Sequence, residues 1–252
     1  MADVKSTLAL VGATGGAGTT RLAVEMGAML ARDGRDVAIF DASFATQGLA
    51  AYVDGRLSTD LTHVLADDEP ASAVRSALPI DAAGSLSAYP CAAPFERLAR
   101  AKTAGAARRF ESAIIDVAGS VDHVLLDVPP IAANQAVAAV AAAERHALVA
   151  PPSERGADGV ARQRARLADV GVDAGALLVN AGVDTEVDDH PLDADATATI
   201  PSSDVTTASD APVSHVGTEQ FSQALASATA ATLDVTLDVE FEEDGLLDGR
   251  LG

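Results

Sequence analysis

The sequence predicts an α/β domain, a single mostly parallel sheet with helices on both faces. Three observations support this fold class. Apolar runs of strand length alternate with segments whose apolar residues recur at helical spacing along most of the 252 residues. Several strand-length runs end in Asp or Asn, which suits the ligand-binding edge of a parallel sheet. The first run leads through a glycine-rich stretch into the first helical segment, as expected where such a strand turns into a helix.

The first strand is expected at 8–11, and the helix that follows it is expected to end at Gly34. Residues 182–198 are acidic and irregular, which is typical of a surface loop. We predict one domain over residues 1–234, followed by an acidic, weakly ordered tail at 235–252. Further strands are predicted at 36–40, 86–89, within 121–130, at 145–150, 176–180 and 199–201, and further helices at 59–65, 70–78, 94–117, 154–170 and 217–233.

The chain is strongly acidic. It has 37 Asp and Glu against 17 Lys and Arg, a net charge of −20, and only two of the basic residues are Lys. With its few aromatic residues, this composition suggests a high-salt cytoplasm such as that of a halophilic archaeon, where ions screen the self-repulsion. The same charge argues against nonspecific binding to nucleic acids or to anionic membrane surfaces.

Cysteine and hydropathy patterns indicate the compartment. Cys91 is the only cysteine, so neither an intrachain disulfide nor a cysteine-based metal site is expected. The N-terminus has no leader-like pattern, and no apolar run is long enough to span a bilayer. We therefore expect a cytoplasmic protein with no membrane helix.

The strongest motif is the stretch Gly12–Arg21, which reads G-A-T-G-G-A-G-T-T-R. Glycines at a strand-to-helix turn let backbone N–H groups and the positive end of the helix approach a phosphate. A phosphate loop of this kind usually carries a lysine before its magnesium-binding hydroxyl, and the ammonium group reaches the outer phosphates. Here Thr19 takes the place of the lysine, and Thr20 supplies the hydroxyl.

Two acids close strand-length runs. Asp41 ends the run 36–40, and Asp127 precedes Pro129 and Pro130, which stop a central strand. The carboxyl ends of parallel strands meet at one edge of the sheet, so both carboxylates are expected beside the phosphate loop. There they suit a magnesium ion and its bound water.

The order of these motifs resembles the MinD/ParA family of deviant P-loop ATPases. The motifs follow one another from about Thr7 to about Asp234. They are a strand, a glycine-rich loop, a strand ending in Asp, a strand ending in D-x-P-P and a strand ending in L-V-N. The resemblance implies a single P-loop α/β domain. It also implies a protein that sandwiches two ATP molecules in a dimer, hydrolyses them slowly and uses the cycle to position cargo.

Position by position, the resemblance implies a preserved binding site and an altered catalytic set. The family's loop reads K-G-G-x-G-K-T-T, so Thr14 and Thr19 replace both of its lysines. Ser43 stands where the family has an Asp that positions the attacking water, and Ile131 where it often has a hinge glycine. We expect weak or absent hydrolysis, because phosphoryl transfer depends on positioned charge, and we assign no catalytic residue.

The resemblance implies Mg-ATP or Mg-ADP as the ligand. Asn180 matches the residue that reads the adenine edge. The metal set is Thr20, Asp41 and Asp127, with the carboxylates acting through water. The nucleotide-binding set is Gly15, Gly16, Ala17, Gly18, Thr19, Thr20, Arg21, Asn180 and Pro201.

Two interpretations of Arg21 stay open. The family's residue at this position lies near the α-phosphate, so the guanidinium group would restore one positive charge. Alternatively, Arg21 is a solvated residue in the first helical turn, where a cation is slightly unfavourable for the helix dipole. We prefer the second interpretation.

Four functions are compatible with the sequence. The first is a nucleotide-responsive interaction or positioning protein that recruits an unknown protein partner through loops near Gln47 and Pro130. The second is an active slow ATPase of the cell-division or partitioning type. The third, an ATP-dependent amidase or synthetase, lacks a recognisable second substrate site, and the fourth is a ligand-free scaffold. A homodimer is possible, although Thr14 removes the lysine that would reach into the partner subunit.

Overall fold

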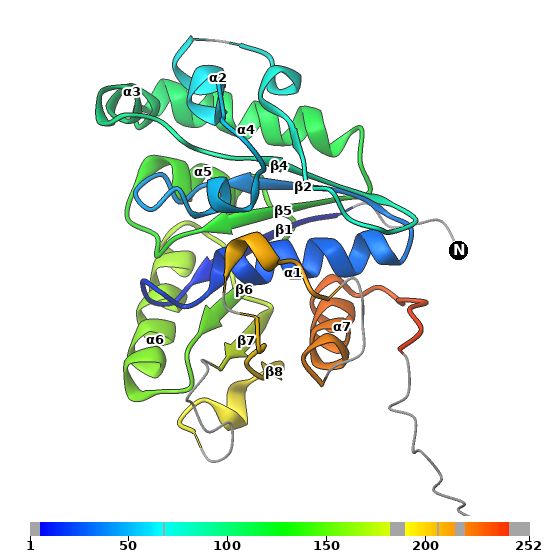
Figure 1. Cartoon of the computed structure of the whole chain (residues 1–252). Helices are drawn as coiled ribbons and strands as arrows, with labels where there is room; N and C mark the ends of the chain where they lie inside the picture. The colour runs from blue at the N-terminus through cyan, green and yellow to red at the C-terminus, as the bar shows by residue number, and fades with distance from the viewer. Residues whose placement is uncertain (1–5, 68, 182–189, 206, 215–219, 242–252) are drawn as a thin grey trace, which may run out of the picture.

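The computed structural model describes residues 6–67, 69–181, 190–205, 207–214 and 220–241 (Figure 1). Its centre is an eight-stranded sheet with the order β3-β4-β2-β5-β1-β6-β7-β8. All neighbouring strands are parallel except β3, which runs antiparallel to β4 at the edge. The strands are β1 (Ser6–Gly12), β2 (Asp36–Asp41), β3 (Ser76–Ala77), β4 (Ser85–Tyr89), β5 (His123–Val128), β6 (Arg145–Ala150), β7 (Ala176–Asn180) and β8 (Ala198–Ile200).

Helices cover both faces of the sheet, which confirms the predicted fold class (Figure 1). Helices α2 to α6 bury their apolar side chains against one face, and α1 and α7 against the other. Short 3-10 helices lie at Gly48–Tyr52 (η1), Ala71–Val74 (η2), Asp193–Asp195 (η3) and Ala208–Asp210 (η4). The α-helices are α1 (Thr19–Arg32), α2 (Leu61–Asp67), α3 (Phe95–Ala101), α4 (Ala104–Ala118), α5 (Asn134–Ala142), α6 (Glu154–Asp169) and α7 (Gln220–Leu233).

Strand β1 shows why the sequence forms a buried central strand. Successive strand side chains point to opposite faces. Leu8 and Leu10 join the core under α1 and α7, whereas Ala9 and Val11 join the core under α2 to α6. A continuous apolar run is therefore buried on both faces.

Two predicted helical segments differ from the structure, and one helix was not predicted. The helix expected at 94–117 is interrupted, because Thr103 accepts a hydrogen bond from the Ala106 N–H and thereby caps a new helix, α4. The segment 70–78 forms only the short η2 before the chain extends into β3. Helix α5 was not predicted, since its Ala-rich sequence has no clear polar face.

The acidic segment after α7 contacts the domain. Within 235–241, alternate apolar side chains pack against the core formed by α1 and α7, and the Arg32 guanidinium lies 4.9 Å from the centroid of the Phe241 ring. The Asp238 N–H donates to the Asp33 carboxylate, and Arg35 donates to the Thr236 carbonyl oxygen. These residues belong to the segment for which the sequence predicts weak order, and residues 242–252 lie outside the described ones.

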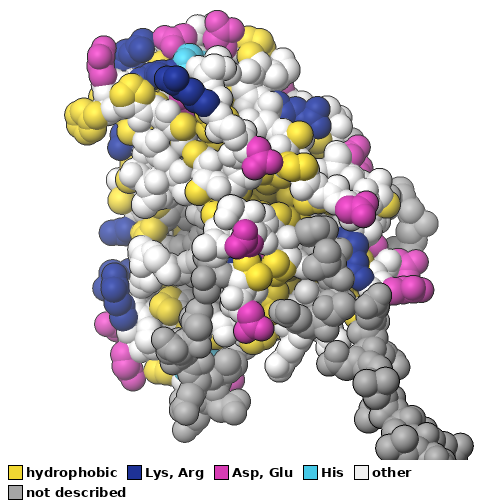
Figure 2. Space-filling view, viewed as in Figure 1, with side chains coloured by type: hydrophobic (Ala, Val, Ile, Leu, Met, Phe, Trp, Pro, Cys, Tyr) yellow, Lys and Arg dark blue, Asp and Glu magenta, His cyan; other side chains and the backbone are white. Residues whose placement is uncertain are grey.

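Among the described residues, no helix combines the length and the apolar character needed to cross a bilayer. On the face shown in Figure 2, acidic side chains are scattered over the surface rather than gathered in one patch.

Candidate functional site

The glycine-rich loop lies at the carboxyl edge of the sheet, between the end of β1 and the start of α1 (Figure 1). Gly16 and Gly18 have φ angles of 79° and 82°, a region in which side chains with a Cβ are strained. Gly18 occupies the N-cap position of α1 and supplies no side-chain cap, so the first N–H groups of the helix stay available for a ligand. The loop lines a pocket of about 370 Å³ together with the end of β5 and residues of the segment that follows β2.

Asn180 lies directly on the loop. Its side-chain amide donates a 3.0 Å hydrogen bond to the Ala17 carbonyl oxygen. A Cβ atom on Gly18 would lie 2.2 Å from the same amide nitrogen, so a larger residue at this strained position would displace the Asn180 side chain. The structure thus gives Asn180 a role in holding the loop, in addition to the base-reading role that the resemblance implies.

The three residues predicted to bind a metal meet in the structure. The Thr20 hydroxyl donates a 2.6 Å hydrogen bond to Asp127 Oδ2. Asp41 and Asp127 lie directly opposite each other on the paired strands β2 and β5, and both are buried. Hydroxyl and carboxylate oxygens are ligands that magnesium prefers, so this oxygen set fits the ion that the resemblance implies.

The two carboxyl groups destabilise each other's charged forms. Burial raises the pKa of Asp41, and the nearby charge of Asp127 raises it further. Burial also raises the pKa of Asp127, while the hydrogen bond from Thr20 opposes this shift. A divalent cation between the carboxylates would remove this repulsion, which is a second reason why the pair suits a metal.

The segment 43–52 covers this site. The Ser43 N–H donates to Asp41 Oδ1 at 2.8 Å, and the Ser43 hydroxyl is bonded to the Thr46 hydroxyl at 2.7 Å. Gln47 has a φ of 53°, which is unusual for a residue with a side chain. A Cβ on Gly48 would lie 3.0 Å from the Thr20 hydroxyl oxygen, so the backbone packs closely against the predicted metal ligand.

Neither threonine that replaces a lysine supplies a positive charge. The Thr14 methyl group is turned towards α6, where a Cβ on Gly159 would lie 2.8 Å from it. Thr14 and Thr19 are both buried in their own chain, although both line the pocket.

Arg21 is not solvated, which corrects the interpretation preferred from the sequence. Its Nε atom donates to Glu25 Oε1 at 2.6 Å, and its Nη1 atom donates to the Val205 carbonyl oxygen at 3.1 Å. Glu25 is fully buried and also accepts hydrogen bonds from the N–H groups of Val213 and Ser214. The guanidinium group lines the pocket, but its charge is paired within the chain.

The loop after β5 is attached to α6. Ile131, which stands at the family's hinge position, is buried, and its N–H donates to Gln163 Oε1 at 3.0 Å. The Ile131 carbonyl oxygen accepts a hydrogen bond from Arg166. Pro201 directly follows β8, which pairs with β7 next to Asn180, but Pro201 does not line the pocket.

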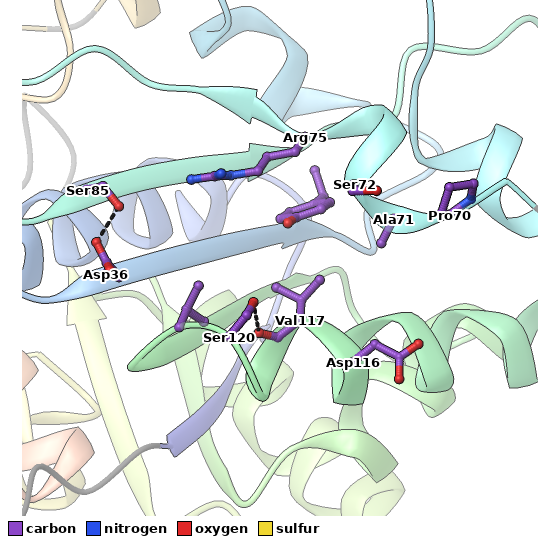
Figure 3. A pocket seen from close by; sticks show the side chains of 11 residues that line it. Asp36, Pro70, Ala71, Ser72, Arg75, Ser85, Asp116, Val117 and Ser120 are labelled. Atoms are coloured by element: carbon purple, nitrogen blue, oxygen red, sulfur yellow. Dashed lines mark hydrogen bonds between the residues drawn. The ribbon is translucent and has the colours of Figure 1, made fainter.

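A larger pocket of about 550 Å³ lies away from the loop, between α4, η2 and strands β2 and β4 (Figure 3). Several of its polar groups bond to one another or to the backbone. Ser85 donates to Asp36, Arg75 Nε donates to Ser87, and Ser120 donates to the Val117 carbonyl oxygen. In the described parts of the chain, no three His, Cys, Asp or Glu side chains gather as a metal site, so the predicted metal position has only two carboxylates.

Sequence reasoning missed two residues of the site. Tyr52 lines the pocket near Arg21, whose charge lowers the pKa of Tyr52 while burial raises it by a larger amount. The second missed residue is Glu25, which forms an ion pair with Arg21. The two lie four residues apart on a mostly apolar helix, and this spacing could have predicted the pair. No local pattern marks Tyr52.

Comparison with known proteins shows similarity of fold without similarity of sequence. No protein-family model and no curated protein matches the chain. The cell division ATPase MinD of Pyrococcus furiosus matches with a TM-score of 0.77 at 18% identity, over 92% of this chain and 99% of that one. The septum site-determining protein MinD of Pyrococcus horikoshii, solved with Mg-ADP, matches with a TM-score of 0.74 at 20% identity, over 89% and 94%. A ParA family ATPase from Chlorobium tepidum matches with a TM-score of 0.65 at 17% identity, over 80% and 86%.

At these identities the likeness establishes the fold, and function has to be argued from the site itself. The chain has the α/β fold that is also found in MinD and ParA ATPases.

Proposed function

We propose that this chain binds a magnesium nucleotide, ATP or ADP, and acts as a nucleotide-responsive interaction or positioning protein with weak or absent hydrolysis. The observation that carries the proposal is the grouping of these residues at one edge of the sheet. The glycine loop, Thr20 and Asp127 line one pocket, and Asp41 is buried opposite Asp127 on the neighbouring strand. Such a loop binds phosphate through backbone N–H groups, which do not depend on the missing lysines.

Weak hydrolysis follows from the same site. Transfer of a phosphoryl group needs cations that stabilise charge on the transferred group, and losing one such contact costs about 3–4 kcal/mol. Thr14 and Thr19 carry no charge, and Arg21 is paired with Glu25. The Ser43 hydroxyl is bonded to the Thr46 hydroxyl, and Ser43 has no carboxylate that could position an attacking water.

The proposed partner surface consists of the segments 43–52 and 129–133, because both border the pocket. Contacts within these segments support a response to nucleotide. The segment 43–52 packs on Thr20 through Gly48, so a ligand at Thr20 would shift it. A second copy of the chain is an alternative partner, although Thr14 is turned into its own subunit.

The central test is a calorimetric titration of the protein with Mg-ATP and Mg-ADP in molar KCl. We expect saturable binding of both, and ATP turnover far below that of lysine-bearing ATPases. The variant Gly18→Ala should not bind, because its Cβ would displace Asn180. Gly105→Ala in α4, where a Cβ meets no atom closer than 4.0 Å, is the matched control and should bind normally.

The alternatives predict different results. Absence of binding by the intact protein would support a ligand-free scaffold. Rapid hydrolysis, alone or with a co-purifying partner, would support an active slow ATPase.

We also propose that the protein works in a high-salt cytoplasm. The net charge of −20 and the small number of lysines support this environment, as does the presence of a single cysteine.

A further inference from the structure

The pocket of about 550 Å³ between α4, η2 and strands β2 and β4 shares no lining residue with the phosphate pocket (Figure 3). Its volume falls in the range of about 300–1,000 Å³ that is typical of small-molecule sites. Tyr89, Val117 and Val121 give it an apolar lining. The Tyr89 ring is fixed by stacking on Phe40, with 4.2 Å between the ring centroids. The cavity therefore suits a ligand with an apolar body.

One wall carries an arginine without an acidic partner. Arg75 directly precedes the edge strand β3, and its Nε atom donates a 2.8 Å hydrogen bond to the hydroxyl of Ser87, which is buried on β4. This bond holds the side chain along β4 (Figure 3). Among the described residues, no carboxylate lies within ion-pair distance of the guanidinium group, and its Nη1 and Nη2 atoms make no hydrogen bond. Both nitrogens are therefore available to a carboxylate from outside the chain.

The Tyr89 hydroxyl is a second donor on this wall. Tyr89 lies two residues after Ser87 on β4, so both side chains are on the same face of the strand. The hydroxyl makes no hydrogen bond to a described residue. Burial raises the pKa of Tyr89 and the nearby charge of Arg75 opposes this shift, so the hydroxyl keeps its proton at neutral pH. A guanidinium group and a phenol hydroxyl together can bind one carboxylate.

The opposite wall carries a carboxylate without a cation. Asp116 lies in the last turn of α4, which contains no basic residue, and its side chain has no partner in the described part of the chain. Figure 3 shows Asp116 on α4 and Arg75 on the β4 side, across the pocket from each other. A helix C-terminus also favours a positive charge. Asp36, the other acid of the pocket, accepts a hydrogen bond from Ser85.

We propose that this pocket binds a short apolar peptide of two or three residues with free ends. The terminal carboxylate binds Arg75 and the Tyr89 hydroxyl, the terminal ammonium group lies at Asp116, and the side chains pack on Val117 and Val121. Fixed polar groups of proteins capture free peptide ends in this way. An anion with several charges would be repelled by the two acids of the pocket. The site is independent of the proposed nucleotide binding.

Titration calorimetry with alanyl-leucine and alanyl-alanyl-leucine in molar KCl tests the site. We expect at least one of these peptides to bind with one-to-one stoichiometry. Its N-acetyl derivative lacks the ammonium group and its C-terminal amide lacks the carboxylate. Each should bind about tenfold more weakly, because each loses one charge-assisted contact.

Two variants assign the charged ends to their walls. Arg75→Gln should weaken binding and remove the difference between the peptide and its amide, but keep the difference between the peptide and its N-acetyl derivative. Asp116→Asn should do the reverse. Arg162→Gln and Asp158→Asn make the same changes at exposed positions of α6 outside the pocket and should bind like the intact protein.

Three results would overturn the site. They are absence of binding of both peptides, equal affinity for a peptide and its two blocked forms, and unchanged binding in both Arg75→Gln and Asp116→Asn. Circular dichroism checks that each variant is folded. Because the titration uses no nucleotide, none of these results bears on Mg-ATP binding, which fails or holds by its own test.

Discussion

At the scale of single residues, the site combines preserved geometry with altered charge. Thr20 is hydrogen-bonded to Asp127, which pairs with Asp41 on the neighbouring strand, and these three residues form the proposed magnesium site. Thr14 and Thr19 stand where the resemblance places two lysines. Thr14 packs towards α6, and Arg21 is bound to Glu25.

The buried carboxyl pair gives a pH-dependent prediction at this scale. In the folded protein the pKa of Asp127 is raised from 3.8 to about 6 and that of Asp41 to about 8, so the metal-free folded state binds more protons than the unfolded state. Metal-free stability should therefore be highest near pH 4 and fall as the pH rises towards 8. Asp127→Asn should flatten this decline and raise the free energy of unfolding at pH 8 by about 2 kcal/mol.

Urea unfolding in EDTA across this pH range measures the effect. Asp116→Asn, an exposed carboxyl group on α4, is the control and should leave the curve unchanged. Adding Mg²⁺ should stabilise the intact protein more than Asp127→Asn. If Asp127→Asn is less stable than the intact protein at pH 8 in EDTA, the prediction is contradicted.

At the scale of elements, the first turns of α1 connect the phosphate loop to the segment between β8 and α7. Arg21 bonds to the Val205 carbonyl oxygen, and Glu25 accepts from the N–H groups of Val213 and Ser214. One ion pair on α1 thus holds this segment at two places, Val205 and Val213–Ser214. The loop after β5 is held in a similar way by Gln163 and Arg166 of α6.

The α1 ion pair gives the second prediction. Arg21→Ala leaves the carboxylate of Glu25 buried without its cation, so it should lower the free energy of unfolding by about 2–3 kcal/mol. Adding Glu25→Gln should recover part of this loss, because the amide oxygen still accepts from the backbone. Arg164→Ala breaks an exposed pair with Asp195 and should cost no more than about 0.5 kcal/mol. Denaturant unfolding of the four proteins tests the prediction, and an Arg21→Ala loss no larger than that of Arg164→Ala would refute it.

The segment 235–241 gives the third prediction. Leu237 and Val239 are half-buried against the core of α1 and α7, so Leu237→Ala with Val239→Ala should destabilise the protein by about 2 kcal/mol. Glu240→Ala changes an exposed side chain in the same segment and should have little effect. Thermal unfolding distinguishes the two. Equal melting temperatures would show that the segment adds nothing to the fold.

At the scale of the whole molecule, the net charge dominates solution behaviour. With 37 acidic and 17 basic side chains, the folded chain repels itself at low ionic strength. The Debye length falls from about 10 Å at 0.1 M salt to about 3 Å at 1 M, so molar salt removes most of this repulsion.

The fourth prediction concerns salt. The melting temperature should rise steadily as KCl increases from 0.1 M towards molar concentrations. Differential scanning calorimetry at several KCl concentrations measures it. A melting temperature that stays constant over this range would argue against adaptation to high salt.

The sequence alone determined the fold class, most strand positions and the edge at which the site lies. It did so because strands such as β1 are apolar on both faces and end in residues that mark the carboxyl edge. It did not predict the break at Thr103 or helix α5, because a cap and an Ala-rich helix have weak local signals.

Only the tertiary structure decided what the altered residues contact. Asn180 holds the loop at Ala17, and Arg21 pairs with the buried Glu25. The physical reason is that spacing along the chain fixes which strand end or helix turn carries a residue, whereas burial and charge pairing depend on segments that lie far apart in the sequence.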